Sequence, residues 1–163
     1  MAIAVTPAPI AGRQQLRGGV HADLSRGPVL LYDGECGVCA ASVQWVLAHE
    51  QRSDLRFAAL QSPMGRSLVA TSGLPETVDS LLWIEADGPA VRVRFYADAV
   101  RAVLRYVGGP WVVLDVCLGI FPAPVRDFGY RLFARHRQAV AAKQCLIPSP
   151  AQKARFVESP AVR

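Results

Sequence analysis

The segment that most limits the possible folds begins with PVLLY at residues 28–32, an apolar run that ends abruptly at Asp33-Gly34. A short, continuously apolar run suits a strand that is buried on both faces. Over residues 37–50 the apolar positions recur at steps of three and four, which is typical of a helix. The alternating run LRFAAL at residues 55–60 then indicates a second strand. This order is a βαβ unit, which favours a parallel sheet with a right-handed crossover.

The pattern after this unit completes a known order of elements. We expect a weak helix at 61–72, strands at 80–85 and 91–96, and an amphipathic helix at 97–107. The Asp87-Gly88 pair between the two strands favours a hairpin. The order β-α-β-α-β-β-α predicts an α/β chain with a thioredoxin-like fold, to which further C-terminal helices are added.

The length of 163 residues, of which 52% are hydrophobic, suits one domain with a substantial core. We expect four parts along the chain: a flexible leader at 1–27, a thioredoxin-like core at 28–108, a helical addition at 109–144 and a closing segment with the tail at 145–163. The Pro-punctuated tail is expected to lie over the surface of the domain.

Neither of the two segments that could direct the chain to a membrane has the required pattern. The leader lacks the apolar run of roughly 7–15 residues that a secretory signal needs. The run WVVLDVCLGIF at 111–121 is shorter than the ~20 residues of a membrane span and carries Asp115. We therefore predict a cytoplasmic protein, in which a C-x-x-C pair is more often catalytic or metal-binding than structural.

Cys36 and Cys39 form such a pair within YDGECGVC at residues 32–39. Cys36 precedes the predicted helix, and sites at a helix N-terminus lower thiol pKa values from about 8.5 to between roughly 3.5 and 7.5. Cys39 lies one turn further on, where it can resolve a mixed disulfide. We predict that Cys36 is the exposed nucleophile and Cys39 the more buried resolving thiol. Asp33 either forms the turn after the strand or takes the proton of Cys39, and the two roles are compatible.

Two other interpretations of the pair are less favoured. A structural zinc site needs four ligands, commonly in two close pairs. The other cysteines and histidines are scattered singly along the chain: Cys117, Cys145, His21, His49 and His136. We therefore expect no bound metal and no bound cofactor. The other interpretation is that both cysteines are ordinary core residues. This would fit Cys39, which lies on a helix face, but not Cys36, which lies in a turn.

The motif D-x-x-C-x-x-C formed by Asp33, Cys36 and Cys39 resembles the signature of the DCC family of thiol–disulfide oxidoreductases. Four later segments are similar to family segments in the same order: RFAALQS, YADAVRAVLRYVG, PAPVRDFGYRLFARHR and CLIPSPAQKARF. The resemblance covers about residues 28–156. It implies a thioredoxin-like fold and dithiol–disulfide exchange, with the three motif residues as its functional residues.

The chain departs from the related patterns at three places. Ala97 stands where the family usually has Ser, and His136 stands where Asn is common. Thioredoxin-like enzymes also place a cis-proline directly before the third strand. Pro75 lies several residues ahead of that strand, so we expect Asp79-Ser80 at this position instead.

The expected partners are a thiol or disulfide substrate, either protein or small molecule, and an external reductase or oxidant. The net charge is +5, and several arginines lie in the predicted helix 125–142. Aromatic residues do not alternate with these arginines as they do in many nucleic-acid sites, so we predict no nucleic-acid partner. We favour a solvated helix face over a phosphate-binding or membrane-surface contact.

Cys117 is expected in the core, and Cys145 is expected to pack the closing segment rather than act as a third redox thiol. The alternative function is a non-catalytic thioredoxin-like binding module or accessory subunit.

Overall fold

The computed structural model describes residues 14–15, 24–72, 74, 80–88, 90–140 and 150–157. The described strands form one five-stranded sheet with the order β1-β5-β4-β2-β3. The strands are β1 (Gln14–Gln15), β2 (Val29–Tyr32), β3 (Arg56–Ala59), β4 (Leu82–Asp87) and β5 (Ala90–Phe95). β2 pairs with β3 in parallel, and the other neighbouring pairs are antiparallel. The predicted parallel βαβ unit and the predicted hairpin of β4 and β5 are therefore both present.

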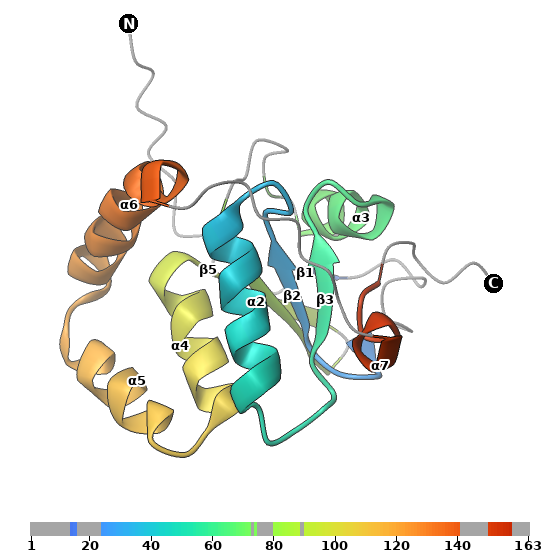
Figure 1. The fold of residues 1–163 in the computed structure, drawn as a ribbon, viewed down its shortest axis with the longest axis horizontal. Helices are drawn as coiled ribbons and strands as arrows, with labels where there is room; N and C mark the ends of the chain where they lie inside the picture. The colour runs from blue at the N-terminus through green and yellow to red at the C-terminus, as the bar shows by residue number, and fades with distance from the viewer. Residues whose placement is uncertain are drawn as a thin grey trace, which may run out of the picture.

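Helices cover both faces of this sheet (Figure 1). The helices are α2 (Gly37–His49), α3 (Pro63–Thr71), α4 (Tyr96–Val107), α5 (Trp111–Ile120), α6 (Ala123–Val140) and α7 (Pro150–Lys153). α2 and α4 lie side by side on one face, while α3 lies on the other. The predicted α/β class with a thioredoxin-like fold and added C-terminal helices is confirmed.

The pleat of β2 explains why the sheet carries two apolar layers. Leu30 points into a cluster that contains Phe57 and Trp83 beneath α2 and α4. Val29 and Leu31 point the opposite way, into the cluster beneath α3. All four residues of β2 are buried, as expected for a strand that is covered on both faces.

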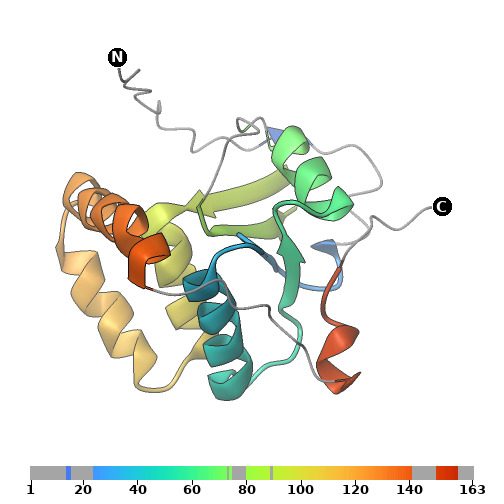
Figure 2. The same cartoon turned by 45° about the horizontal axis from the view of Figure 1, so that its top comes forward.

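The added helices α5 and α6 form an outer layer beside α4 (Figure 2). α5 packs against α4, and α6 packs against α4 and α2. Cys117, which was expected in the core, is exposed on α5. That prediction is wrong because α5 contacts α4 through the side that carries Asp115 and leaves most of its circumference outside. No described helix is both long and apolar enough to cross a membrane.

The closing segment returns to the free side of β3. Phe156 forms a parallel bridge with Phe57, and the two rings stack with centroids 5.4 Å apart. The N–H of Phe57 donates to the Arg155 carbonyl at 2.9 Å, and the N–H of Val157 donates to the Phe57 carbonyl at 2.8 Å. Residues 155–157 therefore add a short stretch of backbone pairing to the sheet beside its edge strand β3, and they also cover the surface there.

Three sequence expectations concern regions that the structure describes in part. Within the expected leader, Gln14–Gln15 pair with β5, and Leu24 is buried in the cluster beneath α3. Pro75 lies outside the described residues, and the described part of the chain contains no cis peptide bond. The division into four parts stays a prediction.

Candidate functional site

The turn after β2 is built by the side chain and backbone of Asp33. Its Oδ1 accepts a hydrogen bond from the Glu35 N–H at 3.0 Å, and its carbonyl accepts one from the Cys36 N–H at 3.2 Å. Gln61, which follows β3, clamps the same turn from the side: its amide Nε2 donates to Asp33 Oδ1 at 2.8 Å, and its Oε1 accepts the Gly34 N–H at 3.1 Å. The structure therefore shows Asp33 in its turn-forming role.

Cys36 is the N-cap residue of α2, with an extended backbone at φ −97° and ψ 116°. Its side chain makes no capping hydrogen bond, so Sγ accepts none from the first turn of the helix. The first N–H groups of any α-helix lack an acceptor inside the helix and carry its positive end. The predicted helix start directly after Cys36 is therefore present.

Both cysteines are buried. Cys36 is 4% exposed and Cys39 is 6% exposed, and both are present as thiols. The expectation that Cys36 is exposed and Cys39 more buried is wrong. Both side chains belong to the apolar cluster between the sheet and helices α2 and α4. The turn therefore directs both thiols toward the body of the domain.

A pocket of about 80 Å³ lies beside Cys39. Its walls come from α2, α4, the segment before β4, and α6, which contributes Tyr130 and Phe133. The Leu81 N–H donates to the Tyr130 hydroxyl at 3.1 Å and so ties α6 to the segment that leads into β4. Sequence reasoning gave no role to Gln61 or Tyr130, although both lie in segments that resemble the family, because their roles depend on contacts between distant parts of the chain. Each contacts a partner at least 28 residues away along the chain.

Among the described residues, metal ligands do not gather at this site. No group of three or more His, Cys, Asp or Glu side chains that could hold a metal ion occurs in the part of the chain that the structure describes. Cys145 and His21 lie outside the described residues. The described surroundings of Cys36 and Cys39 are mainly apolar, and apolar side chains supply no metal ligands.

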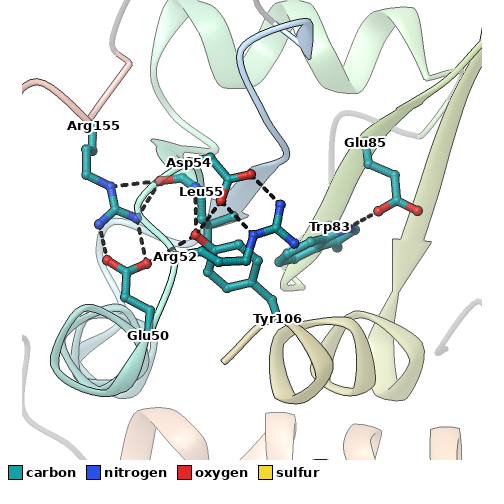
Figure 3. Close-up of polar contacts among 8 residues, drawn as sticks. All are labelled: Glu50, Arg52, Asp54, Leu55, Trp83, Glu85, Tyr106 and Arg155. Atoms are coloured by element: carbon teal, nitrogen blue, oxygen red, sulfur yellow. Dashed lines mark hydrogen bonds and ion pairs between the residues drawn. The ribbon is translucent and has the colours of Figure 1, made fainter. Parts of the chain in front are cut away.

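A second polar cluster lies at the other end of α2, roughly 20 Å from Cys36 along a helix of this length. Figure 3 shows Arg155 between Glu50 and the Leu55 carbonyl, with Tyr106 close by. The Tyr106 hydroxyl accepts the Leu55 N–H at 2.9 Å and donates to Asp54 at 3.0 Å. Burial raises the pKa of Tyr106 to about 12, and the neighbouring carboxylates act in the same direction. The hydroxyl therefore remains a neutral donor at physiological pH.

A hollow of about 330 Å³ adjoins this cluster and is lined in part by arginines. Each of these arginines already has a carboxylate partner in the structure: Arg52 pairs with Asp54, Arg94 with Glu85, and Arg105 with Asp115. These ion pairs neutralise part of the positive charge that lines the hollow and hold its arginines in place. We assign a structural role to this cluster and place the candidate site at the C-x-x-C turn.

A family model and two known proteins match this chain over most of its length. The family model of DCC1-like thiol-disulfide oxidoreductase matches residues 30–143. The chain is 37% identical over 132 residues to "Uncharacterized protein YuxK" of Bacillus subtilis, covering 79% of this chain and 93% of that protein. It is 33% identical over 114 residues to "DCC family protein At1g52590, chloroplastic" of Arabidopsis thaliana, covering 69% of this chain and 64% of that protein. No solved structure gives a significant match.

Proposed function

Because the chain belongs to the family of DCC1-like thiol-disulfide oxidoreductases, we propose that it exchanges dithiols and disulfides through Cys36 and Cys39. The observation that carries this proposal is the position of the pair. Cys36 caps the N-terminus of α2, and Cys39 lies within the first turn of the same helix. A thiolate is the attacking species in such exchange, and the positive end of a helix favours it.

In the reductive direction, the Cys36 thiolate attacks one sulfur of a substrate disulfide. A bond forms between Cys36 Sγ and that sulfur, while the substrate S–S bond breaks and releases the other sulfur as a thiolate. Cys39, after losing its proton, attacks Cys36 Sγ and releases the second substrate sulfur. The substrate gains two electrons, and Cys36 and Cys39 end as a disulfide. An external dithiol reductant restores the two thiols in the same way.

Asp33 is the proposed acceptor for the proton that Cys39 loses. It lies three residues before Cys36, and its carboxylate is held in place by the Glu35 N–H and the Gln61 amide. A positioned general base typically contributes about 10²–10⁴-fold to the rate of a step that it assists. The proposed substrate is a thiol or disulfide of a protein or a small molecule. We propose the cytoplasm as the compartment, because thiols are kept reduced there.

The burial of both thiols favours a second candidate function. With 4% and 6% exposure, neither sulfur meets a bulky protein disulfide unless the turn or α6 moves. A thioredoxin-like binding module that keeps its cysteines without turnover would need no such movement. The two functions differ in whether the thiols react, which can be measured directly.

The test compares the parent chain with Cys36→Ser, Cys39→Ser and Cys117→Ser in the reduction of insulin disulfides and of glutathione disulfide by dithiothreitol. We expect turnover in the parent and loss of turnover in Cys36→Ser. In Cys39→Ser we expect a mixed disulfide to accumulate when the variant is mixed with either substrate without dithiothreitol. Cys117→Ser is the matched control, because its thiol is exposed on α5, and it should retain parental turnover. A folded parent that reduces neither substrate would support the binding module and contradict the enzyme.

A further inference from the structure

The exposed apolar side chains of this protein are concentrated in one region. Ten large apolar side chains are exposed in the described residues, and all of them lie between positions 112 and 133. The three most exposed are Ile120 at 77%, Val113 at 65% and Phe128 at 64%. We call the exposed apolar side chains of residues 112–133 the α5–α6 surface. An apolar surface this concentrated marks an interaction site in a folded protein.

The composition of α5 shows what kind of surroundings it suits. Its sequence WVVLDVCLGI contains a single ionisable carboxylate, Asp115, which is 5% exposed. That carboxylate points at α4, where Arg101 donates to it at 2.6 Å and Arg105 at 2.7 Å. The outer surface of α5 therefore presents no carboxylate. A helix that is apolar on all sides is normally found in a protein core or in lipid.

α6 adds positive charge at the border of this apolar surface. Val125, Phe128 and Leu132 follow one another at steps of three and four and form an exposed stripe. Arg131 and Arg135 are also exposed and, at 100° per residue, lie beside this stripe. The Arg131 guanidinium donates from Nε to the Asp127 carbonyl, which leaves its terminal nitrogens as further donors. Arginines next to Phe and Leu on one helix are typical of helices that lie in a membrane interface.

We propose that the α5–α6 surface docks on an anionic lipid bilayer, with its apolar side chains in the headgroup region and its arginines on lipid phosphates. This contact differs from the solvated helix face that the sequence alone favours for these arginines. The charge favours this partner over a second copy of the chain, since a two-fold interface would bring the same arginines together. Anionic lipids attract basic segments at the cytoplasmic surface of membranes. The contact is with the membrane surface, because no described helix is long and apolar enough to span it.

Docking would also place the candidate site near the lipid. Phe133 is 55% exposed on the α5–α6 surface and lines the pocket beside Cys39 as well. The docking proposal does not depend on thiol chemistry, so a chain with Cys36→Ser should bind vesicles as the parent does.

Flotation of the full chain with lipid vesicles tests the proposal. We expect flotation with phosphatidylcholine vesicles that contain phosphatidylglycerol, weaker flotation with phosphatidylcholine alone, and a loss of binding as salt screens the charges. Ile120→Ser with Phe128→Ser should weaken binding by about tenfold or more on both vesicles, since each removes an apolar side chain from the contact. Arg131→Gln with Arg135→Gln should weaken binding by about tenfold on the anionic vesicles only. Arg66→Gln, at an exposed position of α3, is the control and should leave binding unchanged.

Apart from Cys36→Ser, each substitution is on an exposed side chain, and circular dichroism verifies that the variants are folded. Failure of the folded parent to float with anionic vesicles would overturn the proposal. If the parent binds both kinds of vesicle equally and the arginine substitutions have no effect, the proposed preference for anionic lipid would be overturned. The parent could instead form a dimer in light scattering, lose it in Phe128→Ser, and bind no vesicles. That result would overturn the proposal and assign the surface to an interface between two copies of the chain.

Discussion

At the scale of single residues, Asp33 has one role that the structure shows and a second that we propose. Its Oδ1 closes the turn by accepting from the Glu35 N–H and the Gln61 amide. An asparagine oxygen can accept the same two hydrogen bonds, but an amide cannot accept a proton as a carboxylate does. Substitution at this one position therefore separates the turn from the proton transfer.

We predict that Asp33→Asn keeps the free energy of unfolding within about 0.5 kcal/mol of the parent, because the turn remains. The same change should slow release of the second substrate thiol by about 10²-fold, because the proposed base is lost. Asp33→Ala, the comparison variant, loses the acceptor as well and should cost about 1 kcal/mol. Urea unfolding and single-turnover exchange with glutathione disulfide measure the two effects. If Asp33→Asn exchanges thiols and disulfides at the parental rate, Asp33 does not act as the base and only forms the turn.

The residues of the motif could be found from the sequence, but their surroundings could not. The spacing after PVLLY correctly predicts a helix start at Gly37 and a turn at Asp33. The burial of Cys36 and Cys39 depends on how α2 packs, and α6 joins that packing from about 90 residues further along the chain. Local spacing carries no information on which distant helix will lie there.

At the scale of elements, α5 is attached to the domain by a charged contact with α4 and by the ring of Trp111, whose centroid lies 4.7 Å from that of Trp45 on α2. Asp115 accepts hydrogen bonds from Arg101 and Arg105 of α4. Burial opposes ionisation of this carboxyl, but the hydrogen bonds from Arg105 and Arg101 outweigh it and lower the pKa of Asp115 below its usual value of 3.8. A lowered pKa in the folded state stabilises the fold above pH ~4, and this stabilisation is lost as the pH falls through the folded-state pKa.

We predict that Asp115→Asn lowers the free energy of unfolding at pH 7 by about 2 kcal/mol, since two charge-assisted contacts are weakened. The difference from the parent should shrink as the pH falls below about 4, because the carboxyl of the unfolded parent then binds a proton more readily than the carboxyl of the folded parent. Asp98→Asn is the matched control: its carboxylate is 53% exposed and pairs with Arg126, so its loss should cost less than about 1 kcal/mol. Urea unfolding at pH 7 and pH 3 measures these values. An equal loss at both pH values would contradict a role for the Asp115 charge.

Element order was predictable because buried strands and amphipathic helices leave periodic patterns in the sequence. Val100, Val103, Leu104 and Val107 correctly predicted the helix that became α4. The apolar pattern of α5 gave the wrong environment for Cys117. Apolar composition alone does not distinguish a helix covered by its own chain from one that awaits another partner, and only the packing of α5 shows that its outer side is exposed.

At the scale of the whole molecule, the C-terminal segment joins parts of the chain that are about 100 residues apart. Arg155 donates to both oxygens of Glu50 and, through Nε at 2.9 Å, to the Leu55 carbonyl (Figure 3). Glu50 is the C-cap of α2, and Leu55 directly precedes β3. The guanidinium therefore fixes the connection between α2 and β3 while residues 155–157 extend the sheet.

This arrangement needs the shape of arginine as well as its charge. A lysine has one compact ammonium group, which cannot pair with both Glu50 oxygens and reach the Leu55 carbonyl at once. We predict that Arg155→Lys lowers the free energy of unfolding by about 1–3 kcal/mol, because buried acceptors lose their donors. Arg52→Lys is the matched control, since Arg52 also pairs with a carboxylate but its side chain is 63% exposed, and it should cost less than about 1 kcal/mol. Urea unfolding of the three chains at pH 7 provides the comparison. Equal losses in the two variants would mean that the charge of Arg155, and not its several hydrogen bonds, holds the C-terminal segment in place.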